Sequence, residues 1–317
     1  MASSHERFGD LPAAQLGAPL ATASGTASGG GADPRPFVAA TIGPIVEARA
    51  DAGPNGAREA LAALARIGCP CVQWSVTTPG LRPRELDGTA RRGILTELKR
   101  LELRCSGVDA WIPPGHLLDR STIDRAIGAI EQAILLASDL AGTSDRMRPV
   151  VAVLVPTERE AGEGTAASEL NQAIGALAAR AERAGVVLAD HALPPRPQLP
   201  VGIDPAAALA AGLDPVAQVI AAGPRLASAR LVDCFRSGLR GPVLEPGESR
   251  LDVSAYRVAM SVVGFDGPLI VDSRQWRDPL GGVRVTIDRL TGGTLRRPGE
   301  RSAGGTGSGI DRGAGKP

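Results

Sequence analysis

Aromatic residues are scarce in this chain, making up 3% of its 317 residues, whereas hydrophobic residues of all kinds make up 43%. The core must therefore be built from aliphatic side chains, chiefly Ala, Val, Leu and Ile. Lysine is almost missing, since Lys99 and Lys316 are the only two, and the formal net charge is +1. A charge so close to balance argues against binding to nucleic acid or to an anionic membrane surface. We therefore expect no nucleic-acid or membrane partner.

Cysteines are few, and long apolar runs are missing. The four cysteines lie at or beside predicted strands, which favours buried, reduced thiols over disulfides. Cys69 and Cys71 lack the paired C-x-x-C spacing of a zinc site. No apolar run approaches the roughly 20 residues of a membrane span, and the first residues lack the apolar segment of a signal peptide. These features predict a soluble, cytoplasmic protein.

The two ends of the chain differ in composition from its middle. Residues 1–35 are rich in Ala, Ser, Gly and Pro and have no periodic apolar face, and residues 291–317 resemble them. Such composition predicts disordered tails. Residues 36–290 remain, a length that suits one α/β barrel of about 250 residues.

Short apolar strands alternate with helical patterns throughout the middle of the chain. Their length and continuous apolar character indicate burial on both faces, as parallel sheets require. Helices between them show apolar residues at helical spacing; we expect one to begin at Ser121, another to cover 215–222 and another to be capped by Asp252. A (β/α)8 barrel is predicted, with a doubly wound open sheet as the alternative. The predicted strands are 37–42, 71–75, 105–110, 150–155, 186–190, 199–204, 228–233 and 268–272.

Polar residues follow or end several of these strands. In a parallel barrel the carboxyl ends of all strands meet at one mouth, where active sites lie. All three tryptophans also lie at or just beyond strand ends, where an indole either stacks on a sugar ring or fills the top layer of the barrel. We therefore consider Trp74, Trp111 and Trp276 as substrate-binding candidates, together with His191, whereas His116 is more consistent with a surface loop. The polar residues at or near the carboxyl ends of the predicted strands are Asp190, His191, Asp204, Arg230, Asp233 and Asp272.

Four arginines follow the last two strands, in the region where barrels often bind phosphate. They are Arg236, Arg240, Arg274 and Arg277. Because arginine is abundant along the whole chain, a solvated surface is the competing interpretation. Among these arginines, Arg236 is the substrate-binding candidate.

The second half of the chain resembles a known family of barrels. The segments 185–191, 201–205, 211–215, 229–233 and 264–272 together resemble the sugar phosphate isomerase/epimerase family, the xylose isomerase-like barrels. The resemblance extends from about residue 37 to 290. It implies a xylose isomerase-like TIM barrel acting on a small carbohydrate-like molecule.

The resemblance also implies a site. In that family a divalent metal is held by Glu, Asp, His and Glu at or after the fifth to eighth strands, and carboxylates shuttle a proton between adjacent carbons. The Asp matches Asp204, and the last Glu matches Asp272. The first Glu falls on Ala189, beside Asp190 and His191. The His falls on Arg230, and the Asp that follows it in the family matches Asp233.

Two arrangements of this site follow. In the first, the guanidinium of Arg230 takes the place of the metal and pairs with Asp204 and Asp272, because arginine stays protonated and cannot ligate a metal. In the second, a rearranged site binds Mn, Zn, Co or Mg through Asp190 or His191 with Asp204, Asp233 and Asp272.

Two functions correspond to these arrangements. One is a sugar or sugar-phosphate isomerase/epimerase in which Asp204, Asp272 and Arg230 are catalytic, with or without a divalent metal. The other is a non-catalytic barrel that binds a small polar ligand or a protein partner at the same mouth.

Overall fold

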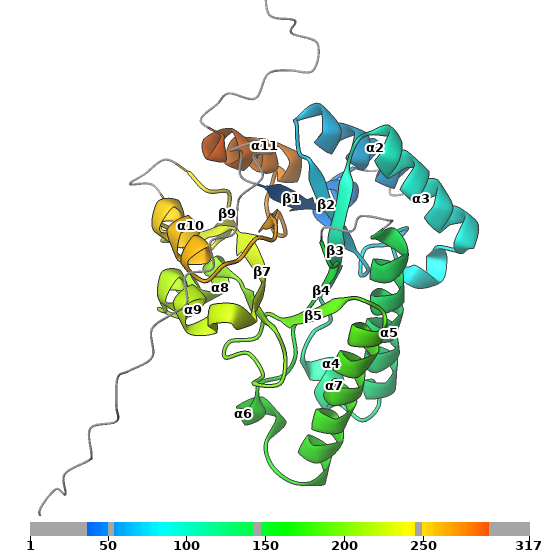
Figure 1. Ribbon diagram of the computed structural model, residues 1–317, viewed down its shortest axis with the longest axis vertical. Coiled ribbons are helices and arrows are strands. Elements are labelled where there is room, and N and C mark those ends of the chain that lie inside the picture. Colours follow the sequence, from blue (N-terminus) through cyan, green and yellow to red (C-terminus); the bar gives the residue numbers. More distant parts are fainter. Residues whose placement is uncertain (1–36, 50–53, 142–146, 245–248, 292–317) are drawn as a thin grey trace, which may run out of the picture. The chain divides into compact units, whose positions relative to one another are not determined.

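Eight parallel strands close into a barrel in the computed structural model, which describes residues 37–49, 54–141, 147–244 and 249–291. The strands follow one another around the barrel in chain order, and β10 closes it against β1 (Figure 1). The barrel strands are β1 (Val38–Thr41), β2 (Cys71–Ser75), β3 (Arg104–Ala110), β4 (Val150–Val153), β5 (Val187–Asp190), β6 (Val201–Ile203), β7 (Leu226–Leu231) and β10 (Leu269–Val271).

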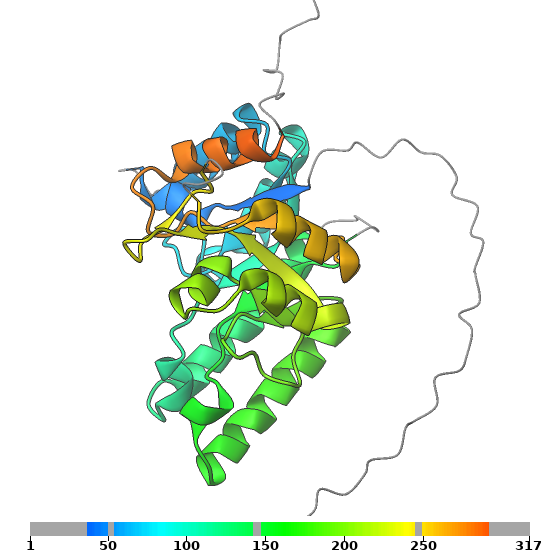
Figure 2. The ribbon, with the colours of Figure 1, turned by 90° about the vertical axis from the view of Figure 1, so that its left-hand side faces the viewer.

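Helices between the strands cover the outside of the barrel. The two longest, α5 and α7, pack against each other and lie side by side in both views (Figure 1, Figure 2). The helices are α1 (Gly43–Glu47), α2 (Pro54–Arg66), α3 (Gly88–Arg100), α4 (Gly115–Leu118), α5 (Ile123–Leu140), α6 (Glu158–Ala161), α7 (Thr165–Arg183), α8 (Pro205–Ala210), α9 (Pro215–Ala222), α10 (Val253–Val262) and α11 (Pro279–Leu290), with 3-10 turns at Pro83–Glu85 and Gly223–Arg225.

Aspartate begins several of these helices. The Asp252 side chain accepts a hydrogen bond from the Ala255 amide at 2.9 Å, which caps α10 as predicted. Asp204, Asp214 and Asp278 cap α8, α9 and α11 in the same way, and each precedes a proline. Proline suits the first helical position because its amide nitrogen has no proton to leave unbonded. Asp204 therefore has a structural role at the start of α8 besides any role in the site.

A β-bulge in β3 decides which way its last residues face. Cys105 pairs with Val72, but the next pair is Gly107 with Gln73, so Ser106 is an extra residue. Gly107 has φ +138 and lies so close to the Val150 backbone that no side chain fits there. An extra residue reverses the alternation of the strand beyond it. Asp109 consequently faces the barrel interior rather than the helices.

Two predicted details differ from the structure. α5 begins at Ile123 rather than at Ser121, because the Ser121 hydroxyl is bonded to Asp119 at 2.8 Å and does not cap the helix. The predicted seventh strand is divided: β7 ends at Leu231, and Asp233 belongs to a separate antiparallel pair, β8 (Asp233–Cys234) with β9 (Arg240–Gly241). The predicted tails, 1–35 and 291–317, lie outside the described residues apart from Thr291. None of the described helices is long and apolar enough to cross a membrane.

Candidate functional site

Three aspartates and three arginines meet at the carboxyl ends of the strands, inside the mouth of the barrel. We call this group the Arg–Asp cluster. One member lies in β3, one follows β6 and two follow β10. The other two lie in β7 and in the short strand β9. They are Asp109, Asp204, Asp272, Arg230, Arg240 and Arg274.

Arg230 lies at the centre of the cluster. Its Nη2 donates to Asp109 Oδ1 at 2.9 Å, and its Nη1 donates to Asp272 Oδ2. The same Nη1 lies 3.7 Å from Asp204 Oδ2. One guanidinium thus contacts carboxylates from three different strands, which the fan of N–H groups on arginine allows.

Arg240 and Arg274 complete the cluster from the solvent side. Arg240 donates from Nη1 to Asp204 Oδ1 at 3.1 Å and from Nη2 to Asp272 Oδ2 at 2.8 Å. Arg274 makes a two-pronged contact with Asp272, at 2.8 Å from Nε and 2.6 Å from Nη2. Every carboxylate therefore has at least one guanidinium partner, and the formal charges of the six groups cancel.

Burial and the neighbouring arginine charges shift the pKa values of these carboxyl groups in opposite directions. Burial raises the pKa of Asp272 to about 6, although Arg230 and Arg240 oppose the shift. Burial also raises the pKa of Asp109, again against Arg230. Burial pushes the pKa of Asp204 upward too, but Arg240 and Arg230 together outweigh it and hold that pKa below its usual range. The arginines thus favour ionised Asp204 more strongly than burial disfavours it, whereas burial prevails at Asp109 and Asp272.

Arg240 and Arg274, rather than the aspartates or Arg230, face solvent. The side chains of Asp109, Asp204 and Asp272 are 2%, 2% and 0% exposed. Those of Arg240 and Arg274 are 17% and 21% exposed. A molecule that enters the mouth therefore meets hydrogen-bond donors first, and it reaches a carboxylate only if an arginine moves.

A cavity of about 350 Å³ opens directly over the cluster. It is the mouth pocket, lined by Pro44, Glu47, Trp111, Arg240, Arg274 and Gln275. Gln275 has φ +66, a left-handed conformation that is uncommon outside glycine and that recurs at ligand sites. Glu47 accepts a hydrogen bond from Thr78 at 2.7 Å. Neither Glu47 nor Gln275 ends a predicted strand, so the strand-end pattern did not point to them.

Trp111 forms one wall of the mouth pocket, as its position after β3 led us to expect. Arginine guanidinium groups already stack on its ring: Arg274 lies 3.9 Å and Arg230 4.4 Å from the ring centroid. His191 lies edge-on to the same indole, with ring centroids 6.5 Å apart. Trp111 therefore steadies two arginines of the cluster, which limits the ring face left for a sugar.

His191 is buried beside the cluster and neutral. Its Nε2 is 3.1 Å from the Ser228 hydroxyl, and its Nδ1 has no hydrogen-bond partner among the described residues. Burial, aided by the charge of Arg230, holds the pKa of His191 well below its usual range. The ring packs against the backbone of Gly202, where any larger residue would collide with it.

Asp190 and Asp233 do not join the cluster, because backbone amides use their carboxylates. Asp190 accepts from the amides of Val155, Ala192 and Arg196 at 3.2, 2.9 and 2.8 Å. Asp233 likewise accepts from the amides of 234, 250 and 251 and from the Ser249 hydroxyl. Both aspartates hold loops in place. The structure thus brings Asp204 and Asp272 together but leaves the other two proposed carboxylate ligands apart.

The remaining candidates lie away from the mouth pocket. Trp74 is fully buried and donates to the Leu81 carbonyl at 2.9 Å, outside the barrel wall. Trp276 is buried against Gly282 of α11. Arg236 and His116 are exposed, as expected for His116. Among the sequence-derived substrate-binding candidates, Trp111 lines the mouth pocket.

A divalent metal does not fit the Arg–Asp cluster. The guanidinium of Arg230 lies among the carboxylates that would have to bind the metal, and it cannot itself be a ligand. In the ranges that the structure describes, no three His, Cys, Asp or Glu side chains are arranged to hold a metal ion.

The barrel has the fold of the xylose isomerase-like TIM barrels, as its similarity to solved structures shows. A xylose isomerase domain protein from Planctomyces limnophilus superposes with a TM-score of 0.58 at 17% identity, over 82% of this chain and 97% of that one. A xylose isomerase-like TIM barrel protein from Mycobacterium smegmatis, in complex with magnesium, gives 0.58 at 13% identity, over 81% and 95%.

An epimerase has the same fold. The D-psicose 3-epimerase of Clostridium cellulolyticum H10, solved with D-tagatose, gives a TM-score of 0.58 at 11% identity, over 80% of this chain and 98% of that one. No protein-family model matches the chain, and no curated protein matches it. At these identities the similarity establishes the fold, and the function must be argued from the site.

Proposed function

We propose that this protein binds a small, acidic, carbohydrate-like molecule in the mouth pocket without a metal ion. The observation that carries the proposal is the position of Arg230, whose buried guanidinium contacts Asp109, Asp204 and Asp272. A fixed cation thereby occupies the carboxylate cluster, where the resemblance to metal-dependent isomerases leads one to expect a metal.

The chemistry of the pocket wall supports an acidic ligand. Arg240 and Arg274 are the parts of the cluster that reach solvent, and arginine binds carboxylates and phosphates through paired N–H donors. Glu47 and Gln275 supply acceptors and donors suited to hydroxyl groups. A sugar acid or a sugar phosphate offers both features on one small molecule, and D-tagatose in the similar epimerase shows that a sugar fits a barrel of this kind.

Calorimetric titration in the presence of EDTA tests the proposal. The ligands are D-glucuronate, D-gluconate and D-glucose 6-phosphate, with D-glucose as the neutral reference. We expect at least one acid to bind one-to-one and at least about 10-fold more tightly than glucose, the gain typical of a charge-assisted hydrogen bond. Arg274→Gln should abolish that preference, whereas Arg236→Gln, with the same charge change on an exposed residue outside the pocket, should retain it.

Metal analysis supplies the opposing outcome. Elemental mass spectrometry on protein purified without chelator should show no stoichiometric Mn, Zn, Co or Mg. One equivalent of metal that disappears in Asp204→Ala would refute the proposal, as would binding of none of the three acids.

An isomerase or epimerase is the second candidate, favoured by the raised pKa of Asp272. A carboxyl group with a pKa of about 6 can exchange protons near neutral pH. Its side chain is 0% exposed beneath arginines, however, so catalysis requires Arg240 or Arg274 to move aside. Conversion of D-tagatose or D-fructose with added Mn²⁺, Co²⁺ or Mg²⁺, lost in Asp272→Asn, would establish this candidate over simple binding.

A further inference from the structure

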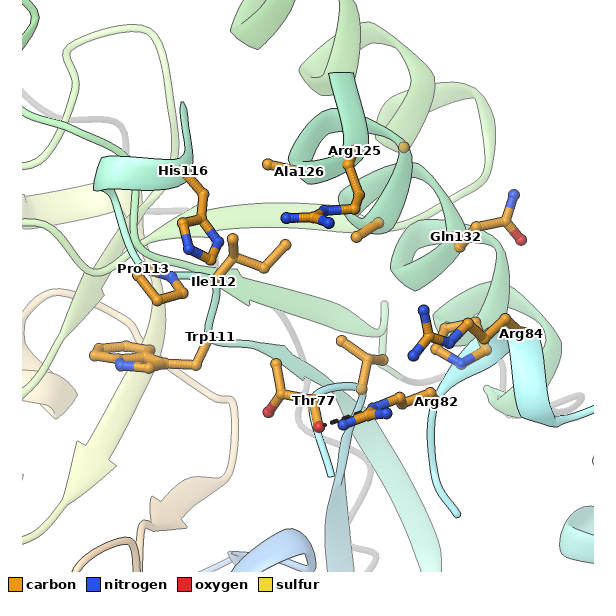
Figure 3. Close-up of a pocket in the computed structure, with 14 residues that line it drawn as sticks. Thr77, Arg82, Arg84, Trp111, Ile112, Pro113, His116, Arg125, Ala126 and Gln132 are labelled. Atoms are coloured by element: carbon orange, nitrogen blue, oxygen red, sulfur yellow. Dashed lines mark hydrogen bonds between the residues drawn. The ribbon is translucent and has the colours of Figure 1, made fainter. Parts of the chain in front are cut away.

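A second, larger cavity shares Trp111 with the mouth pocket. This groove encloses about 580 Å³ between the residues that follow β2, the residues that follow β3, and one face of α5. Its floor is apolar and includes Val76, Ile112, Pro113, Ala126 and Ala129. Figure 3 shows Ile112 near its middle and Trp111 at one end.

Three arginines and one histidine surround this apolar floor. They are Arg82, Arg84, His116 and Arg125. His116 and Arg125 lie on one side of the groove, and Arg82 lies on the opposite side (Figure 3). The side chains therefore approach the groove from three separate segments of the chain, the turn after β2, α4 and α5.

Few acids lie close to these basic side chains. Glu85 contacts Arg82 at 3.4 Å and Arg84 at 4.0 Å. Asp119, near His116, is occupied by hydrogen bonds from Ser121. Arg125 forms no hydrogen bond or ion pair with any residue in the described ranges.

We propose that this groove is a second ligand site, which binds a small organic anion with an apolar body, such as an aromatic or aliphatic carboxylate. The apolar floor stabilises the body by removing it from water. Arg125 and Arg84 then pair with the anionic group at the rim. This site uses no member of the Arg–Asp cluster, so it goes beyond the function proposed for the mouth pocket.

Two fluorescent probes of almost the same shape test this proposal. The first, 8-anilinonaphthalene-1-sulfonate, has an aromatic body with a sulfonate. The second, N-phenyl-1-naphthylamine, has the same aromatic body without the charge. We expect the sulfonate to bind full-length folded protein saturably at one site and more tightly than the uncharged probe.

Charge variants separate the rim from the floor. Arg125→Gln should weaken sulfonate binding about 5-fold, the upper range for a partly exposed ion pair. It should leave the uncharged probe unaffected. Arg257→Gln on α10, which contributes nothing to the groove, is the matched control and should change neither probe.

A filling variant tests the cavity itself. Gly128 of α5 lines the groove, and a side chain added there meets open space, so Gly128→Phe should fill the groove and abolish binding of both probes. Gly175→Phe makes the same change at an equally open helical position of α7 and should abolish neither. Retained binding in Gly128→Phe, or equal losses in Arg125→Gln and Arg257→Gln, would overturn the proposal. Normal melting of each variant shows that it is folded.

Discussion

Arg230→Met removes the cation at the centre of the Arg–Asp cluster while keeping a long, flexible side chain in its place. The loss falls mainly on Asp109, which keeps only Arg274 Nη1 at 3.5 Å. Asp272 retains Arg240 at 2.8 Å and Arg274 at 2.6 Å, and Asp204 retains Arg240 at 3.0 Å. One buried carboxylate is thus left without a close partner.

The expected loss of stability follows from the buried Asp109 carboxylate, which lacks a close counter-charge in this variant. Removing one partner of a buried ion pair typically lowers the free energy of unfolding by about 3–5 kcal/mol. Asp109 already has a raised pKa, and losing Arg230 raises it further, so acid pH relieves the variant by protonating the carboxyl group. The loss should therefore be larger at pH 8 than at pH 5.

Equilibrium unfolding in urea, followed by circular dichroism, measures this loss. Adding Asp109→Asn to the Arg230→Met variant should restore about 2 kcal/mol of the free energy of unfolding, because the unpaired Asp109 carboxylate is then removed. Arg100→Met breaks the short but exposed ion pair with Glu97 and should leave stability unchanged within error. A loss below about 1 kcal/mol in Arg230→Met, or no recovery with Asp109→Asn, would refute the idea that Arg230 is the essential counter-charge.

Three further predictions concern single groups. The pKa of Asp272 is raised from 3.8 to about 6, so its stabilising contribution is present at low pH and is lost as the pH rises through 6. The stability of Asp272→Asn relative to wild type, measured by urea unfolding at each pH, should therefore rise by about 2 kcal/mol from pH 4 to 7, and parallel curves would contradict this. His191, whose pKa is far below its usual range, should stay neutral at pH 5.5 in nitrogen-15 NMR, whereas a charged ring at that pH would show that the site is open to water. Gly175→Ala, in open space on α7, should raise the free energy of unfolding by about 0.5–1 kcal/mol, and a decrease would show an unrecognised contact.

Local sequence patterns were sufficient to predict the alternation of strands and helices, whereas closure of the sheet into a barrel is decided by the tertiary structure. Apolar strands separated by amphipathic helices carry their periodicity in the sequence itself, and β2 and α9 have the predicted bounds. Asp252 could be predicted as a helix cap because capping depends on residues within one turn. The pairing of Asp204 and Asp272 with Arg230 could also be proposed, since strand ends meet at one mouth whatever the details of packing.

Other members of the cluster depend on the tertiary structure. Strict alternation from Cys105 would turn Asp109 outward, and the bulge at Ser106 turns it inward instead. Arg240 reaches Asp204 because β8 and β9 pair and fold the chain back over the mouth. Asp190 and Asp233 end predicted strands, where metal ligands are expected, yet backbone amides donate hydrogen bonds to their carboxylate oxygens. Strand periodicity indicates which face of a strand is buried. The bulge in β3, the β8–β9 pair and the backbone amides that bond Asp190 and Asp233 all depend on contacts between residues distant in the sequence. Only the tertiary structure therefore decides which charged side chains form the cluster.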